Sequence, residues 1–122
     1  MDTLRLDLRQ DATRQGIRAQ LFALLDTAAI QGIQDAVGAL AVSGGHCHDV
    51  GEVYALLDAQ DLPDTVRQDA KAVYEILAQA EAAVHGCEVE QTHFHEVGNH
   101  EAVANVLQVC LAVAALGPVR VV

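Results

Sequence analysis

A seven-residue stretch, Thr92 to Gly98, holds two imidazoles and a carboxylate within four positions, since it reads Thr-His-Phe-His-Glu-Val-Gly. In an extended backbone, His93 and His95 would point to one side while Phe94 packs inward on the other. Neutral imidazole is the commonest protein ligand for zinc, nickel and copper, and a nearby carboxylate ligates the ion or orients the ring. The stretch predicts a metal site that includes His93, His95 and Glu96. Two histidines do not complete such a site, so surface or helix-capping roles stay open.

A second stretch with metal-binding side chains covers residues 43–49 and reads Ser-Gly-Gly-His-Cys-His-Asp. This glycine-led loop presents His46, Cys47 and His48 consecutively, which makes His46 and His48 further candidate ligands. The alternative is a small polar loop whose histidines have no ligand role.

A third candidate pair, Glu81 and His85, lies near the end of a long helical pattern that stops at Gly86. Residues four apart share a helix face, so the two side chains can bind one ion or orient one another. An ordinary solvent-facing ion pair is the alternative. The connection from Gly86 to His93 is short enough to fold back, so we expect His93 and His95 to lie near this pair.

The elements that position these side chains are predicted to be mostly helices. Leu4, Leu6 and Leu8 alternate with polar residues, which predicts a short strand. Helical spacing then predicts two helices between 13 and 40, separated near 27–31, and a third helix opened by an Asp49–Glu52 capping box. A long helix is predicted to follow, with Asp61 as its N-cap, Pro63 in its first turn and its end at Gly86. A last helix over 99–116 and a strand over 119–122 complete the predicted elements.

Two of these helices are expected to build the core. The long helix carries one predicted apolar stripe, formed by Val66, Ala70, Val73, Leu77, Ala80 and Val84. The last helix is apolar around much of its circumference, so we expect it to be central, with Cys110 as a core residue rather than a ligand.

The predicted fold class is mainly α with a small β component (α+β). Packed helices would be joined by short amino- and carboxy-terminal strands that pair in parallel, which would bring the two ends of the chain together. The length of 122 residues suits one domain, 1–122.

Composition narrows the classes of partner. The chain is 52% hydrophobic and only 3% aromatic, which favours closely packed helices of Ala, Val and Leu. A net charge of −10 argues against nucleic acid or an anionic membrane as partner and favours a cation. Three cysteines without a secretory signal pattern indicate a reducing cytoplasm. The most apolar run, 102–116, is too short to span a bilayer.

Taken together, residues 80–82 (Ala-Glu-Ala), 84–86 (Val-His-Gly) and 93–98 (His-Phe-His-Glu-Val-Gly) resemble the amino-terminal domain of the nickel insertion protein that matures the lactate racemase cofactor. That family inserts nickel into pyridinium bisthiocarboxylic acid mononucleotide. The resemblance covers about residues 46–122. This chain differs in two loops, because residues 9–16 replace a glycine-rich loop and a long histidine-rich loop is reduced to His46 and His48.

The resemblance implies a protein that binds nickel, or zinc as an alternative, and holds or delivers Ni(II) during maturation of a nickel pincer cofactor. In the family, nucleotide-dependent insertion is associated with a carboxy-terminal region that lies outside these 122 residues. We therefore expect an incomplete enzyme that works with a separate nucleotide-binding insertase half.

Two other classes of function stay open. One is a helical interaction domain, such as a homo-oligomer, with incidental histidines. The other is a small zinc hydrolase with Glu96 as general base. The sequence disfavours the hydrolase, because it holds no His-Glu-x-x-His motif and is too short for a metal-binding barrel.

Overall fold

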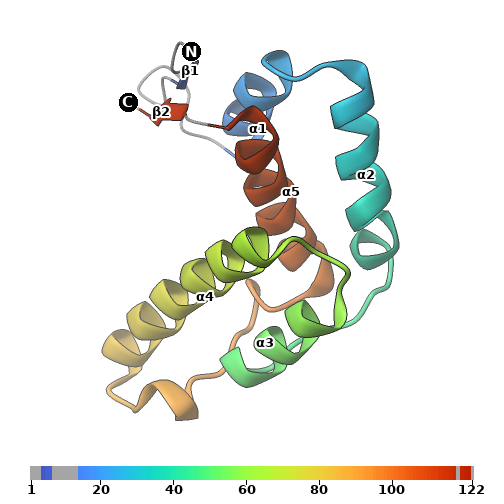
Figure 1. Ribbon diagram of the computed structural model, residues 1–122. Helices are drawn as coiled ribbons and strands as arrows, with labels where there is room; N and C mark the ends of the chain where they lie inside the picture. The colour runs from blue at the N-terminus through green and yellow to red at the C-terminus, as the bar shows by residue number, and fades with distance from the viewer. Residues whose placement is uncertain (1–3, 7–13, 118, 122) are drawn as a thin grey trace.

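The computed structural model describes residues 4–6, 14–117 and 119–121, and these are mainly helical (Figure 1). In chain order the elements are β1 (Leu4–Leu6), α1 (Arg14–Ala23), α2 (Thr27–Ala41), α3 (Val50–Ala59), α4 (Asp64–His85), the 3₁₀ turn η1 (Val89–Gln91), α5 (His100–Leu116) and β2 (Val119–Val121). Strands β1 and β2 pair in parallel, with Leu4 opposite Val119. Among the described residues these two three-residue strands form only a two-stranded sheet, so the α+β class is supported only in its coarser part, a mainly helical fold.

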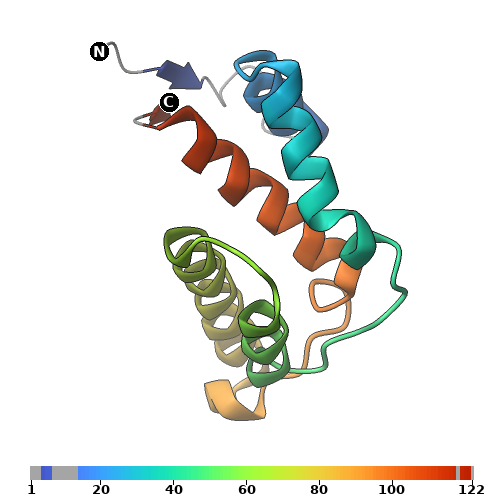
Figure 2. The same cartoon turned by 45° about the vertical axis from the view of Figure 1, so that its right-hand side comes forward.

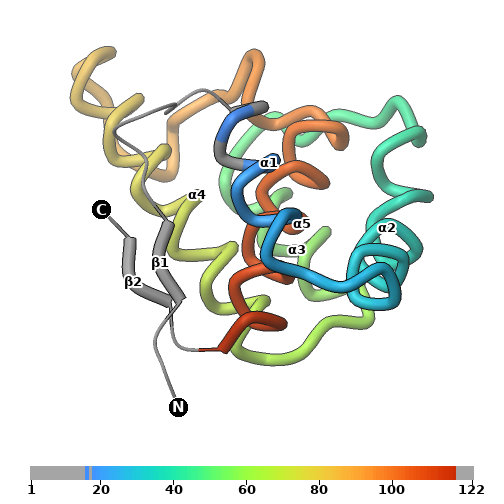
Figure 3. Tube along the Cα trace, turned by 90° about the horizontal axis from the view of Figure 1, so that it is seen from above, coloured from blue at the N-terminus to red at the C-terminus, as the bar shows by residue number. Residues whose placement is uncertain are grey.

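Helix α5 lies at the centre of the helical part, as predicted. It packs against α1, α2 and α4, while α3 packs against α4. Figure 2 shows α5 crossing between the α1–α2 pair and the α3–α4 pair, and Figure 3 shows it between α2 and α4. None of the described helices is long and apolar enough to cross a membrane.

Buried side chains form two apolar clusters on α5. The larger cluster joins α2, α3, α4 and α5, and it includes Cys47 and Phe94 from the histidine-bearing loops. The smaller cluster joins α1, α2 and α5 through Leu21, Ile33 and Ala112. Cys110 is 8% exposed in the larger cluster, so the predicted core role of this cysteine is confirmed.

The buried face of α4 differs from the predicted stripe beyond Ala70. The buried residues are Val66, Ala70, Tyr74, Ala78 and Ala82. Val73 is 36% exposed and Val84 is 79% exposed, so their placement in the core was wrong. The predicted set and the buried set both recur at helical spacing, so contacts with the rest of the fold decide which of the two sets is buried. Tyr74 is fully buried because its hydroxyl donates to the Val97 carbonyl oxygen at 2.7 Å.

The predicted start of α4 at Asp61 was also wrong. The helix begins at Asp64, and Pro63 is its N-cap, without a side-chain capping bond. A residue before proline is driven out of the helical conformation, so Leu62 cannot belong to a first turn. The break between the first two helices comes earlier than predicted, because Asp26 accepts a hydrogen bond from Ala29 N at 2.8 Å and caps α2.

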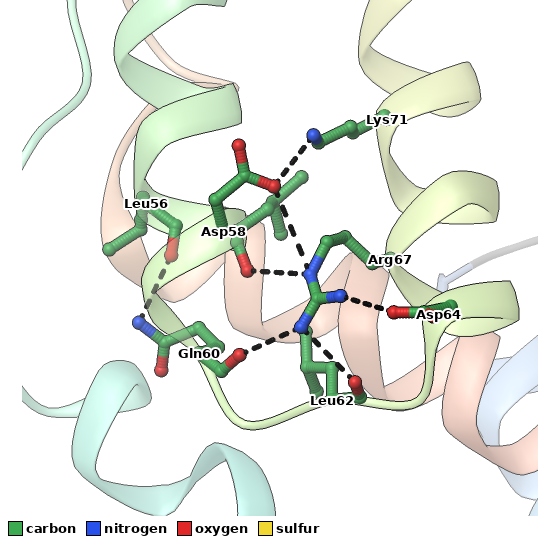
Figure 4. A network of polar contacts seen from close by, with 8 residues as sticks. Leu56, Asp58, Gln60, Leu62, Asp64, Arg67 and Lys71 are labelled. Carbon is green, nitrogen blue, oxygen red and sulfur yellow. Dashed lines mark hydrogen bonds and ion pairs between the residues drawn. The ribbon is translucent and has the colours of Figure 1, made fainter.

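Arg67 holds the connection between α3 and α4 in place of a side-chain cap (Figure 4). Its guanidinium donates to three carbonyl oxygens, those of Leu57 at 3.4 Å and of Gln60 and Leu62 at 3.1 Å each. It also pairs with Asp64 at 2.7 Å. Because one side chain satisfies the end of α3 and the loop together, the two helices form a fixed hairpin.

Candidate metal centre

The two histidine-bearing loops lie side by side, joined by their backbones. Three backbone hydrogen bonds connect them: Phe94 N to His48 O and Cys47 N to Gly98 O, each 2.7 Å, and His100 N to Gly45 O, 2.9 Å. His46 and Asn99 form an antiparallel bridge. We call residues 45–48 and 94–100 the loop junction. It brings together histidines that are about 50 positions apart in the sequence.

Two glycines allow the loop junction to close. A Cβ at Gly98 would overlap the Cys47 carbonyl oxygen, and a Cβ at Gly45 would overlap the His100 ring. The ring is held in place because His100 Nδ1 lies 2.5 Å from the Ser43 hydroxyl oxygen. A side chain at Gly98 would push the two loop backbones apart, whereas a side chain at Gly45 would displace the His100 ring.

Local capping fixes one side of the junction. Asp49 caps α3 as predicted, since its carboxylate accepts from Glu52 N at 2.8 Å. The reciprocal bond differs from a capping box, because Glu52 accepts from His48 N at 2.5 Å instead of the N-cap residue's own N–H. The backbone of His48 is therefore bonded at both its N–H and its carbonyl.

The other loop is anchored through Phe94. This ring is 2% exposed and lies 5.8 Å, centroid to centroid, from Tyr74. His93 and His95, on either side of it, are exposed. The alternation expected for an extended backbone is present, so both imidazoles point away from the core.

An open pocket of about 190 Å³ gathers three of the histidines. It is lined by His85, Cys87, Gln91, Thr92, His93 and His95. Gly86, with φ of 65°, ends α4 in the left-handed conformation as predicted and turns the chain back toward the 92–98 loop. Within the described part of the chain, no three His, Cys, Asp or Glu side chains already converge at coordinating distance.

Hydrogen bonds decide which ring nitrogen carries the lone pair in two histidines. His85 Nε2 lies 3.1 Å from the Glu81 carboxylate, and His46 Nε2 lies 3.1 Å from the His95 carbonyl oxygen. These oxygens only accept, so each Nε2 carries the hydrogen and each neutral ring keeps its lone pair on Nδ1. A carboxylate behind a histidine in this way orients the ring toward a metal.

The seven predicted ligands therefore fall into separate groups. His85, His93 and His95 share the pocket, with Glu81 bonded to His85. His46 and His48 form a second pair with ring centroids 4.9 Å apart. Glu96 is exposed, and its backbone carbonyl accepts a bond from the Asn99 amide at 2.8 Å.

The three cysteines have different environments. Burial raises the pKa of Cys47, with a smaller effect from Glu52 and Asp49, and burial raises the pKa of Cys110 to about 11. Cys87 is partly exposed and lines the pocket. The sequence patterns did not single out Cys87, although its place directly after the Gly86 stop is the signal that could have done so.

The chain matches a known protein family and curated members of it. The family described as "Nickel insertion protein" matches residues 2–122. The pyridinium-3,5-bisthiocarboxylic acid mononucleotide nickel insertion protein of Staphylococcus epidermidis is 36% identical over 72 residues, which cover 59% of this chain and 18% of the relative. A putative nickel insertion protein of Synechococcus elongatus is 47% identical over 73 residues, with the same two shares.

A third relative extends the match. The corresponding protein of Staphylococcus saprophyticus is 32% identical over 88 residues, 71% of this chain and 22% of the relative. The chain spans about a fifth of the length of the curated relatives that it matches. No solved structure matches. Because the family match runs over nearly the whole sequence, this chain belongs to the nickel insertion protein family.

Proposed function

We propose that this chain binds Ni(II) as cargo and holds or delivers it during maturation of a nickel pincer cofactor. The observation that carries the proposal is the pocket into which one α4 histidine and two loop histidines are gathered. The nickel insertion family and the names of the relatives support nickel as the ion.

The donors suit such an ion. Imidazole nitrogens bind nickel and zinc well, whereas magnesium and calcium prefer oxygen ligands. His85, His93 and His95 are exposed, so their side chains can rotate toward one ion without disturbing the core. An exposed site also allows the ion to leave, which a protein that delivers the ion requires. The net charge of −10 attracts a cation to the surface.

The remaining candidates have supporting roles in this proposal. Glu81 orients His85 through its hydrogen bond, and Glu96 adds negative charge to the same loop as His93 and His95. His46 and His48 form a second pair that holds an ion before transfer. Insertion itself would require a nucleotide-binding insertase half in addition to these residues.

Calorimetric titration with nickel and zinc tests the site on protein purified without an affinity tag. We expect the wild type to bind and a variant with both His93→Ala and His95→Ala to lose binding. Glu81→Ala should weaken binding less, by the ~10–100-fold typical of an outer-shell partner. Glu90→Ala, which removes an exposed carboxylate from η1, is the matched control and should bind as the wild type does.

Two results would overturn the proposal. Absence of measurable nickel or zinc binding by the folded wild type would exclude a metal site. Unchanged affinity in the His93 and His95 double variant would exclude this pocket.

A further inference from the structure

We propose that Cys87 is a thiolate ligand of the pocket, so that the site is a mixed imidazole and thiolate centre. This inference rests on the proposed nickel function and names a ligand that neither the motif nor the family match indicates. A thiolate would make the site selective for nickel, zinc and cobalt against magnesium, manganese and calcium.

The backbone places the sulfur at the pocket. Cys87 follows Gly86, and its N–H donates to Ala82 O at 3.1 Å, which closes the end of α4. Its side chain lines the same pocket as His85, His93 and His95. One thiol and three imidazoles therefore line one pocket. Among the described residues no three of these groups lie at coordinating distance, so the exposed imidazoles must rotate toward the thiol to bind a single ion.

Thr92 determines how the thiol is oriented. The Thr92 hydroxyl lies 3.3 Å from the Glu88 carbonyl oxygen, which can only accept, so this hydroxyl donates there. Its oxygen is then left to accept from the Cys87 S–H, at 3.9 Å. Thr92 is only 1% exposed, so this partner is fixed. The thiol hydrogen is directed at Thr92, which leaves the sulfur lone pairs free for an ion.

Metal binding by Cys87 requires only a proton transfer. The S–H bond breaks, a sulfur–metal bond forms and the proton passes to water, with no change of oxidation state. The other two thiols are unsuitable, because Cys47 is 4% exposed and Cys110 is 8% exposed.

The test is titration of the full chain with Ni(II) and with Co(II), followed by near-ultraviolet absorption. A bound thiolate gives a sulfur-to-metal charge-transfer band, which imidazole ligands do not give. We expect the band in the wild type and its loss in Cys87→Ser, with affinity weakened by ~10-fold or more, at least the effect of losing an outer-shell partner. The control Cys47→Ala removes the thiol between His46 and His48 and should keep the band.

A second measurement uses only the wild type, so it does not depend on the folding of a variant. Iodoacetamide should alkylate Cys87 in the absence of nickel, and bound nickel should protect it, as read by peptide mass spectrometry. Alkylation of Cys87 at an equal rate with nickel bound would overturn the thiolate role.

The outcomes separate the two proposals. Nickel binding that depends on His93 and His95 but gives no charge-transfer band would overturn the thiolate ligand and leave the histidine site standing. A band that survives Cys87→Ser would also overturn it. Absence of nickel binding in the wild type would overturn both.

Discussion

Gly98 lies directly against Cys47. Its carbonyl oxygen accepts the Cys47 N–H at 2.7 Å, and a Cβ at position 98 would overlap the Cys47 carbonyl oxygen. The contact joins the loop that carries His46 and His48 to the loop that carries His95. The arrangement of the candidate metal-binding histidines therefore depends on a glycine that has no side chain to take part in the chemistry.

Gly98→Ala should destabilise the fold, because the added methyl group must separate the two loops. Overpacking of this kind costs about 1–3 kcal/mol. Urea denaturation measures the loss, and nickel affinity should fall with it. The matched control is Gly38→Ala in α2, where an added Cβ meets nothing within 4 Å. Gly38→Ala should stabilise the helix by about 0.5–1 kcal/mol. If both variants changed the free energy of unfolding in the same direction, the close contact at Gly98 would be contradicted.

Arg67→Lys should destabilise the α3–α4 hairpin. A lysine cannot reach the carbonyl oxygens of Leu57, Gln60 and Leu62 together, so we expect a loss of about 1–2 kcal/mol in urea denaturation. Lys71→Gln is the control, because it removes the ion pair with Asp58 at 2.7 Å and a contact of the ammonium with the Tyr54 ring at 5.7 Å, but no hydrogen bond to a carbonyl oxygen of the α3–α4 connection. An ion pair at the surface contributes about 0–1 kcal/mol. Equal losses in the two variants would show that the carbonyl bonds of Arg67 add nothing.

Both tyrosines should resist ionisation in the folded protein. The pKa of Tyr54 is raised to about 12 by burial and by the carboxylate of Glu75, and burial raises the pKa of Tyr74 further. In the unfolded chain both ionise near ~10. Their contribution to stability is therefore complete below that pH and is lost as the pH rises through the folded values.

Ultraviolet titration with parallel circular dichroism measures this effect. The chain has two tyrosines and no tryptophan, so tyrosinate absorbance is read without interference. We expect the absorbance to rise only as the helical signal falls, whereas the urea-unfolded chain should titrate near ~10. Ionisation of both phenols near that value in a still helical protein would contradict the prediction.

Metal affinity should fall as the pH drops through the range in which imidazoles protonate. Protons and the ion compete for the same ring nitrogens, so the slope of affinity against pH reports how many histidines bind. Calorimetry at several pH values gives this slope. A site made only of carboxylates would keep its affinity to about pH 4–5. Persistence of binding to that pH would therefore argue against His85, His93 and His95 as ligands.

The sequence by itself determined the features that depend on neighbours within a turn or two. Asp49 caps α3 and Gly86 ends α4 because each acts on backbone groups a few residues away. The burial of Phe94 between two exposed histidines follows from the alternation of an extended chain. The prediction that α4 starts at Asp61 failed because the conformation that Pro63 imposes on Leu62 outweighed the capping signal of Asp61.

Only the tertiary structure decided which histidines meet and which face of α4 is buried. The loop junction consists of backbone hydrogen bonds between segments about 50 residues apart, and backbone groups carry no sequence pattern. Tyr74 enters the core because a distant carbonyl, that of Val97, satisfies its hydroxyl. Cys87 joins the pocket because the reversal at Gly86 brings it to Thr92 and His93. Such long-range partners become visible only when the chain is folded.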